Sequence, residues 1–289
     1  MKFLVFGVGR SGQLGREFCD YLAAKHYDFK SYNSLNLDIS DALKMEEVIA
    51  NERPSVILNC AAYTNVDQAE DDHHMAFKIN HIAVRDLAKL SRKYDVRLIH
   101  FSTDYVYPGM EEDRLLHSKG YKENHRTDPL NVYGESKLLG ENEIIKSGCD
   151  HLIIRVSWLC GKYGKNFVKT MIDLGLQGRR LQVVNDQWGS PTFTKDLVQN
   201  TMILVNKGVS GIFNYTSDGL INWYELAKKS LELANVKTKI EGVPSEEYPT
   251  RAIRPRFSKL NTEKIKTINE IKIPDWKSGL KELIEDLEF

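Results

Sequence analysis

The chain lacks several features that would set it apart from ordinary globular proteins. Its cysteines, Cys19, Cys60, Cys149 and Cys160, lie far apart and form no C-x-x-C pair. This spacing is typical of reduced thiols in the cytoplasm and predicts neither a disulfide framework nor a zinc site. No apolar run approaches the roughly 18 residues of a membrane helix. The apolar run within the first seven residues is too short for a signal peptide, so we expect a cytoplasmic protein.

An excess of one charge is also missing. The 40 Lys and Arg residues balance the 40 Asp and Glu residues, so no single-sign field points to nucleic acid or an anionic membrane. Internal repeats, low-complexity tracts and Pro/Ser linkers are absent as well. The composition therefore predicts a folded protein that binds neither nucleic acid nor membrane.

Short apolar runs alternate with helical patterns through about the first 160 residues. The expected strands lie at 2–7, 27–32, 56–59, 97–102 and 152–156. This alternation predicts an α/β fold with a Rossmann-type, doubly wound parallel sheet over residues 1–160. Residues 161–289 predict a smaller C-terminal α/β substrate lobe, from which the segment at about 194–215 is a candidate to return to the first domain.

A glycine-rich loop follows the first expected strand and opens a helical pattern. Gly9, Gly12 and Gly15 have the G-x-x-G-x-x-G spacing, and Gly7 makes the loop about two residues longer than its simplest form. Glycines allow a tight turn and close backbone approach, while a helix N-terminus offers free N–H groups to a pyrophosphate. The order of strand, loop and helix favours nucleotide binding over a glycine turn without a ligand.

The end of the second expected strand bears on the choice of dinucleotide. A carboxylate there would accept hydrogen bonds from a ribose 2′-hydroxyl and favour NADH. Asn33 stands at about that place, with Lys30 nearby, so we expect NADPH to be at least tolerated. Asp38 and Ile39 follow before a helix capped by Ser40 or Asp41, and Asp38 is equally consistent with a capping role.

Two further strand ends carry candidate ligand-binding residues. Ala61 and Ala62 follow the third strand, where small side chains let a flat group approach the backbone. Thr103 ends the fourth strand at the same edge of the sheet. Its hydroxyl can hydrogen-bond a substrate carbonyl or merely form a turn at the strand end, and the residue alone does not decide between them.

Tyr133 and Lys137 lie four apart at the start of a helical pattern that follows Pro129. This spacing places both side chains on one helix face. A lysine ammonium favours the phenolate, so we expect Lys137 to lower the pKa of Tyr133 and make it a usable proton donor. Taken alone, the pair is also consistent with an ordinary surface contact.

Two charged segments remain. Residues 108–128 predict a long surface loop with the potential of a lid, and the eight-residue spacing of His117 and His125 predicts no metal site. Residues 251–256 concentrate positive charge in Arg251, Arg254 and Arg256. This cluster fits either a solvated face or, if it faces a cleft, a bidentate clamp for a diphosphate.

Several stretches together resemble the dTDP-4-dehydrorhamnose reductase family of extended short-chain dehydrogenase/reductases, in chain order over nearly the whole sequence. These stretches are Gly12-Gln13-Leu14-Gly15, Cys60-Ala61-Ala62-Tyr63-Thr64, Ser102-Thr103-Asp104-Tyr105-Val106, Asn131-Val132-Tyr133-Gly134-Glu135-Ser136-Lys137, Arg155-Val156-Ser157-Trp158, Asn166-Phe167-Val168-Lys169-Thr170-Met171, Val184-Asn185-Asp186-Gln187-Trp188-Gly189-Ser190-Pro191-Thr192 and Arg254-Pro255-Arg256-Phe257-Ser258.

The resemblance implies an enzyme that uses NADPH or NADH to reduce the C4 ketone of dTDP-4-dehydro-β-L-rhamnose, giving dTDP-L-rhamnose for cell-surface polysaccharide. It implies that Tyr133 donates the proton, Lys137 holds the nicotinamide ribose and Thr103 orients the carbonyl. The implied cofactor-binding residues are Gly9, Gly12, Gln13, Leu14, Gly15, Asp38, Ile39, Ala61, Ala62, Tyr63, Thr64, Asn80, Phe101, Tyr133 and Lys137. The implied substrate-binding residues are Thr103, Asp104, Trp158, Asn166, Gln187, Arg254 and Arg256.

Two alternatives remain. The chain is a reductase of another nucleotide-linked 4-keto-deoxysugar, or a non-catalytic NADP-binding regulatory subunit, although its retention of Thr103, Tyr133 and Lys137 favours an enzyme. The sequence is compatible with a monomer or a homodimer. Some relatives use a metal-bridged dimer in which Glu17 would take part, but Lys195 stands where a second carboxylate would be useful. We therefore expect no required metal.

Overall fold

The computed structural model describes residues 1–10 and 12–287, and a parallel sheet lies at its centre. Within those residues the sheet contains the strands β1 (Lys2–Phe6), β2 (Asp28–Tyr32), β3 (Val56–Asn59), β4 (Arg97–Thr103), β5 (His151–Val156) and β10 (Gly211–Tyr215). The order is β2-β1-β3-β4-β5-β10, and each neighbouring pair is parallel. The order reverses between β1 and β3, the place where open α/β sheets bind ligands at their carboxyl ends.

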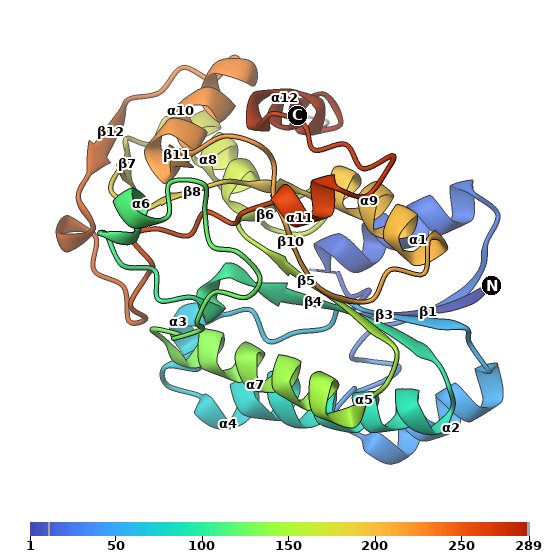
Figure 1. The fold of residues 1–289 in the computed structure, drawn as a ribbon. Helices are drawn as coiled ribbons and strands as arrows, with labels where there is room; N and C mark the ends of the chain where they lie inside the picture. Colours follow the sequence, from blue (N-terminus) through green and yellow to red (C-terminus); the bar gives the residue numbers. More distant parts are fainter. Residues whose placement is uncertain (11, 288–289) are drawn as a thin grey trace.

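Helices cover both faces of this sheet (Figure 1). One face carries α1 (Gln13–Ala24) and α9 (Thr194–Asn206), and the other carries α2 (Ala42–Glu52), α5 (Ala83–Lys93) and α7 (Val132–Ser147). Phe18 and Leu197 bury against the first face, whereas Met45 and Leu87 bury against the second. The predicted doubly wound parallel sheet is confirmed.

Burial on both faces explains why the central strands are continuous apolar runs. Phe3, Leu4, Val5 and Phe6 of β1 are fully buried, as expected for a parallel strand between two helical layers. β2 lies at the edge of the sheet, and its Asp28 and Lys30 are exposed. Charges on an edge strand discourage pairing with another chain.

The region between β3 and β4 is less regular than the single long helical pattern predicts. It contains α3 (Val66–Ala69), α4 (His73–Phe77), a π-helical turn η1 (Lys78–Ile82) and then α5. Asn65 and Asp72 each accept a hydrogen bond from a backbone N–H at the start of α3 and α4. These two caps break the helix, and Asn80 lies in the π-helical turn.

The chain after β5 builds a second layer of elements beside the sheet. Its helices are α8 (Phe167–Leu176), α10 (Trp223–Leu233) and α12 (Trp276–Glu285), with a 3-10 turn η3 (Ser245–Glu247). The short helix α11 (Glu263–Lys266) instead buries Ile265 in the core of the first sheet. The strand pairs of this layer are β6 (Leu159–Cys160) with β9 (Thr192–Phe193), β7 (Leu181–Val184) with β12 (Ile240–Val243), and β8 (Trp188–Gly189) with β11 (Ile221–Asn222). Ile172, Phe193, Leu226 and Leu280 share a core there.

Two further elements of this later chain, α9 and β10, also leave that layer: β10 joins the first sheet at its edge, and α9 packs against one face of it. Both fall within the segment at 194–215. The division into residues 1–160 and 161–289 stays a prediction.

The segment 108–128 lies largely at the surface, as its polar composition predicts, but it is anchored at one point. It contains α6 (Asp113–Leu116) after the 3-10 turn η2 (Asp104–Val106), and Tyr121 is fully buried. The Tyr121 hydroxyl donates to Asp113 and accepts from the N–H of Gly109, and its ring stacks on Tyr107 with centroids 4.7 Å apart. A backbone bridge joins Tyr121 to Leu260. One buried aromatic residue therefore ties an otherwise exposed segment to the rest of the protein.

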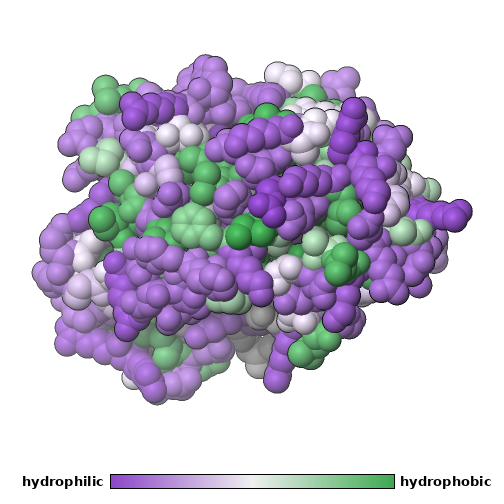
Figure 2. Space-filling model, turned by 90° about the horizontal axis from the view of Figure 1, so that it is seen from below, coloured by the Kyte–Doolittle hydropathy of each residue, from purple (hydrophilic) through white to green (hydrophobic). Residues whose placement is uncertain are grey.

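The surface seen from below in Figure 2 is mostly hydrophilic, with hydrophobic side chains in separate groups among polar ones. Among residues 1–10 and 12–287, the structure contains no helix with both the length and the apolar character needed to cross a membrane.

Candidate active site

A cleft of about 690 Å³ opens at the carboxyl ends of the central strands. Its volume lies within the roughly 300–1,000 Å³ that small-molecule sites occupy. It brings together most of the predicted site residues: Gly9, Gly12, Gln13, Leu14, Asp38, Ile39, Ala61, Ala62, Tyr63, Thr64, Phe101, Thr103, Asp104, Tyr133, Lys137, Trp158, Asn166 and Arg254. The other predicted residues, Gly15, Asn80, Gln187 and Arg256, do not line it.

The glycine loop forms one end of the cleft. A Cβ on Gly12 would lie 2.1 Å from the carbonyl oxygen of Gly7, and one on Gly15 would lie 2.8 Å from the same atom. These two glycines therefore let α1 pack directly against the loop. A Cβ on Gly9 would meet nothing within 4 Å, so this residue leaves the cleft side of the loop open. The N-terminus of α1 has free N–H groups in the first turn, and Gly12 has no side chain to cap them.

The loop after β2 forms the neighbouring wall. Asn33 lines the cleft, and its Oδ1 accepts a hydrogen bond of 2.8 Å from the N–H of Leu35. Asp38 accepts from the backbone N–H and the hydroxyl of Ser40, while Asp41 caps α2. Asp38 is therefore not the cap of α2, and it remains available on the cleft wall.

Asn80 supports the cleft from behind. Its Oδ1 accepts from the N–H of Tyr63 at 2.9 Å, and its Nδ2 donates to the carbonyl of Tyr63 and to Ser136 Oγ at 3.0 Å each. Asn80 is only 1% exposed. It holds the loop that carries Ala61 and Ala62 against α7, so its role in this structure is to fix the shape of the wall.

Thr103 and Asp104 follow β4 directly and face the same cleft. Thr103 Oγ1 donates to Asp104 Oδ1 at 3.0 Å and accepts from the N–H of Tyr105 at 3.2 Å. The turn predicted for Thr103 is confirmed, because the residue caps η2; it also lines the cleft, and its hydrogen bond to a substrate carbonyl stays a prediction. Burial raises the pKa of Asp104 to about 7, and its hydrogen bonds with Ser258 and Thr103 oppose that rise.

Tyr133 reaches the cleft from the first turn of α7, which Asn131 caps through a hydrogen bond of 2.8 Å from the N–H of Gly134. Burial raises the pKa of Tyr133 above its ordinary value, Thr103 opposes the rise through a hydrogen bond, and Asp104 adds to it. The expectation of a lowered tyrosine pKa is therefore wrong for this structure. The phenol is protonated at neutral pH, which is the state that a proton donor needs.

Lys137 lies one helical turn further along α7 and is directed toward β4. Its Nζ donates to the carbonyl oxygen of Phe101 at 2.6 Å and lies 3.3 Å from His100 Nε2. Only 2% of the residue is exposed, and burial lowers its pKa to about 8. Lys137 is not among the groups that shift the pKa of Tyr133, where burial of the phenol is the largest effect.

Two tryptophans close the far side of the cleft, and only one of them was predicted. Trp158 has a left-handed backbone with φ of +48°, and its indole stacks on that of Trp223 with centroids 3.8 Å apart. Phe167 packs on Trp223 at 4.6 Å. The stack fixes Trp158 in a conformation that is uncommon for a bulky residue. Trp223 is the first residue of α10, and no local sequence pattern predicts its contact with Trp158.

Two arginines of the predicted positive cluster, Arg254 and Arg256, lie in different places. Arg254 lines the cleft, and its Nη2 lies 2.6 Å from Asp67 while its Nη1 lies 3.3 Å from the hydroxyl of Tyr105. Arg256 pairs with Asp186 and with Glu246 outside the cleft lining. Gln187 is near that network, where its Nε2 donates to Ser245 Oγ at 3.0 Å.

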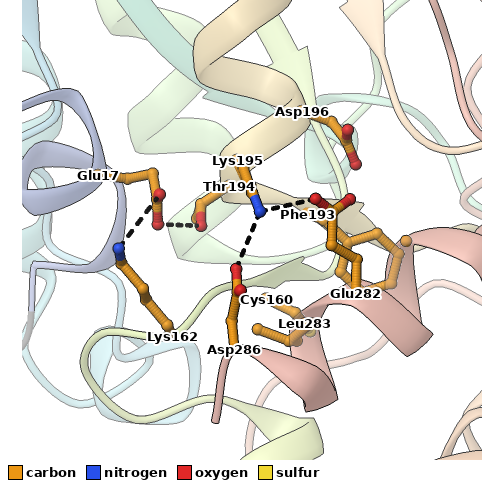
Figure 3. A pocket seen from close by; sticks show the side chains of 11 residues that line it. Glu17, Cys160, Lys162, Phe193, Thr194, Lys195, Asp196, Glu282, Leu283 and Asp286 are labelled. Carbon is orange, nitrogen blue, oxygen red and sulfur yellow. Dashed lines mark hydrogen bonds and ion pairs between the residues drawn. The ribbon is translucent and has the colours of Figure 1, made fainter. Parts of the chain in front are cut away.

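A second, smaller hollow lies between α1, α9 and α12 (Figure 3). There the Nζ of Lys195 lies 2.6 Å from Glu282 and 3.2 Å from Asp286, and Thr194 donates to Glu17 at 3.0 Å. Lys195 thus supplies positive charge between the carboxylates of α12. Over residues 1–10 and 12–287, no three His, Cys, Asp or Glu side chains are grouped so that they could hold a metal ion.

Comparison with known proteins assigns the family. A family model described as the RmlD substrate binding domain matches residues 1–289. The chain belongs to this family. A dTDP-4-dehydrorhamnose reductase of Escherichia coli K12 is 36% identical over 302 residues, which cover 99% of this chain and 98% of that protein. A dTDP-4-keto-6-deoxy-D-glucose reductase of Streptomyces niveus is 34% identical over 275 residues, covering 94% and 93%.

A solved structure agrees with this assignment. The crystal structure of dTDP-4-dehydrorhamnose reductase from Bacillus anthracis, in complex with NADP, has a TM-score of 0.93 and 36% sequence identity, with 99% of each chain covered. The predicted family and the Rossmann-type fold are confirmed, and the chain is an oxidoreductase.

Proposed function

We propose that the chain uses NADPH or NADH to reduce the C4 ketone of dTDP-4-dehydro-β-L-rhamnose to dTDP-L-rhamnose. The observation that carries this proposal is the meeting of Thr103, Asp104, Tyr133 and Lys137 in the cleft that also holds the glycine loop. Full-length relatives named for this reaction support the choice of substrate.

The residues of the cleft fit a dinucleotide. The open side of Gly9 and the free N–H groups of α1 suit a pyrophosphate, and Ala61 and Ala62 leave room for a flat ring. When bound, the reduced nicotinamide supplies the hydride. Lys137 holds the ribose beside it, and Asn33 places an amide just after β2, where a carboxylate would repel a 2′-phosphate.

The chain itself handles the charge that develops on the substrate oxygen. A ketone that accepts a hydride becomes an alkoxide, which needs hydrogen-bond donors placed in advance and a proton. Tyr133 gives the proton, and its raised pKa does not prevent this because an alkoxide is a stronger base than a phenolate. Thr103 orients the carbonyl, while Asp104, Trp158, Asn166 and Arg254 bind the sugar nucleotide.

A second candidate substrate deserves the same assay, because a relative of nearly equal identity is named a dTDP-4-keto-6-deoxy-D-glucose reductase. The two ketosugars differ in ring configuration, so the Trp158 side of the cleft would have to discriminate between them. We propose the rhamnose precursor as the better substrate.

The deciding experiment follows NADPH oxidation at 340 nm with enzymatically generated dTDP-4-dehydrorhamnose, with dTDP-4-keto-6-deoxy-D-glucose in parallel. We expect kcat/KM to be at least tenfold higher for the former. A higher kcat/KM for dTDP-4-keto-6-deoxy-D-glucose would make that sugar the proposed substrate. No NADPH oxidation with either ketosugar would contradict both proposals. We further propose that the enzyme needs no metal and is a cytoplasmic monomer or homodimer. Activity retained in EDTA would support the first of these proposals.

A further inference from the structure

The side chains of Asn59, His100 and Lys137 form a hydrogen-bonded chain behind the cleft, of which the mechanism above uses only Lys137. Asn59 Nδ2 lies 3.1 Å from His100 Nδ1, and His100 Nε2 lies 3.3 Å from Lys137 Nζ. The three residues are 1%, 0% and 2% exposed. At this burial, water cannot satisfy their polar atoms, so each atom must find a hydrogen-bond partner within the protein.

The backbone fixes the direction of this chain at one end. The N–H of Ala61 donates to Asn59 Oδ1 at 3.3 Å, so the amide atom that faces His100 is the nitrogen, which only donates. Nδ1 of His100 is then an acceptor. Burial holds the pKa of His100 well below its ordinary value, so the imidazole is neutral and carries its single proton on Nε2.

That proton points at Lys137 Nζ. An uncharged amine accepts it with its lone pair, whereas an ammonium has only donors and cannot. An ammonium at Nζ requires the reverse order: Nζ donates to Nε2, Nδ1 donates to Asn59, and the amide of Asn59 turns its oxygen toward the ring. The N–H of Ala61 then loses its acceptor and is free to donate into the cleft, which Ala61 lines.

We propose that Asn59 and His100 are positioning residues that couple the charge of Lys137 to the backbone of Ala61. The imidazole stays neutral throughout. Its tautomer and the orientation of the Asn59 amide change together when Nζ gains a proton from solvent. A charged Lys137 and a free Ala61 N–H therefore arise together, and both can contact the polar groups of a bound dinucleotide.

The other groups around Lys137 do not reproduce this coupling. The carbonyl oxygen of Phe101 accepts from Nζ in either charge state. Cys60 and Glu141 also act on Lys137 electrostatically, and each favours its charged form. Glu141, however, is held by Arg155 at 2.5 Å. The imidazole is thus the neighbour of Nζ whose proton must move when the lysine changes charge.

The tautomer is directly measurable in the complete protein by long-range ¹H–¹⁵N NMR of histidine-labelled samples between pH 6 and 10. The His100 signals are assigned with the His100→Gln variant. We expect the Nδ1–H tautomer at pH 6 and the Nε2–H tautomer at pH 10, with a midpoint close to the lysine pKa of about 8. One unchanged tautomer across this range would overturn the proposal. This measurement needs no substrate.

Variants test the same coupling. Asn59→Asp presents only acceptors to the ring, so we expect the Nδ1–H tautomer even at pH 10. The matched variant Asn200→Asp changes a buried amide of α9 and should leave the pH-dependent tautomer change of His100 in place. Loss of the tautomer change in Asn200→Asp would overturn the proposal. A tautomer change retained in Asn59→Asp would overturn it too.

A second variant covers the case in which Asn59→Asp does not fold. The amide oxygen of His100→Gln accepts from an ammonium, so the midpoint of the kcat–pH profile should rise by about one unit. An unmoved midpoint in the folded variant would overturn the coupling. This kinetic readout rests on the proposed function, so absence of turnover together with a tautomer switch would count against the function alone.

Discussion

Burial of Lys137 makes a prediction about stability that can be worked out from the structure. Folding lowers the pKa of this lysine from 10.5 to about 8. Each unit of pKa shift corresponds to about 1.4 kcal/mol, so the buried charge costs the folded state roughly 3 kcal/mol at pH 7. Replacing Lys137 with methionine removes this cost but also removes the hydrogen bond to Phe101, worth about 1 kcal/mol. We expect Lys137→Met to be more stable by about 2 kcal/mol at pH 7.

The sign of the pH dependence follows from the same shift. Between pH 8 and 10.5 the unfolded chain binds more protons at this lysine than the folded chain does. Wild-type stability therefore rises with pH in that window. Lys137→Met lacks this rise, so its advantage should fall from about 2 kcal/mol at pH 7 to near zero at pH 10.

Urea unfolding followed by tryptophan fluorescence at pH 7 and pH 10 measures this difference. The exposed Lys89 of α5 provides the control, and Lys89→Met should stay within about 0.5 kcal/mol of wild type at both values. A Lys137→Met variant no more stable than wild type at pH 7 would refute the reasoning, as would a gain that persists at pH 10. The stabilised variant should also lose turnover, as an active-site trade-off requires.

Three further predictions concern the cleft. Tyr133→Phe should lower kcat by about 10²–10⁴-fold while NADPH affinity, measured by fluorescence titration, stays within a few-fold; near-normal turnover would exclude Tyr133 as the donor. Gly12→Ala should abolish NADPH binding and lower the melting temperature, because its Cβ would lie 2.1 Å from the Gly7 carbonyl oxygen. Unchanged NADPH binding would show that the cofactor site does not depend on close packing of α1 against the glycine loop. Asn33→Asp should raise KM for NADPH about tenfold and leave KM for NADH unchanged, because only NADPH has a 2′-phosphate to repel; equal effects would place Asn33 away from that phosphate.

Local patterns were enough to predict the framework of the molecule. Each central strand is a short apolar run, and the glycine loop stands next to the first of them, so sequence order alone gives their succession. Parallel strands end at one edge of the sheet, which is why Thr103 and Ala61 could be placed in one cleft before any contact was known.

Features that depend on partners distant in the chain were not predictable in this way. Trp223 joins the site only because α10 packs beside Trp158, and Tyr121 is buried only because the chain near Leu260 covers it. Arg256 offered an unpaired charge in the sequence, but folding brings it to Asp186. The effect of Lys137 on Tyr133 was misjudged because desolvation, which no motif records, is the larger effect.

The position of β10 has a consequence during synthesis on the ribosome. β5 ends at Val156, but its outer neighbour in the sheet is not complete until Tyr215 has been made. At about 5–20 residues per second, this gap lasts roughly 3 to 12 s. Throughout that interval the nascent chain presents a strand edge with the apolar sequence Leu-Ile-Ile, a ready template for pairing with another chain. A fragment that stops after β5 should therefore aggregate, and chaperone binding to the nascent chain should be concentrated in this interval.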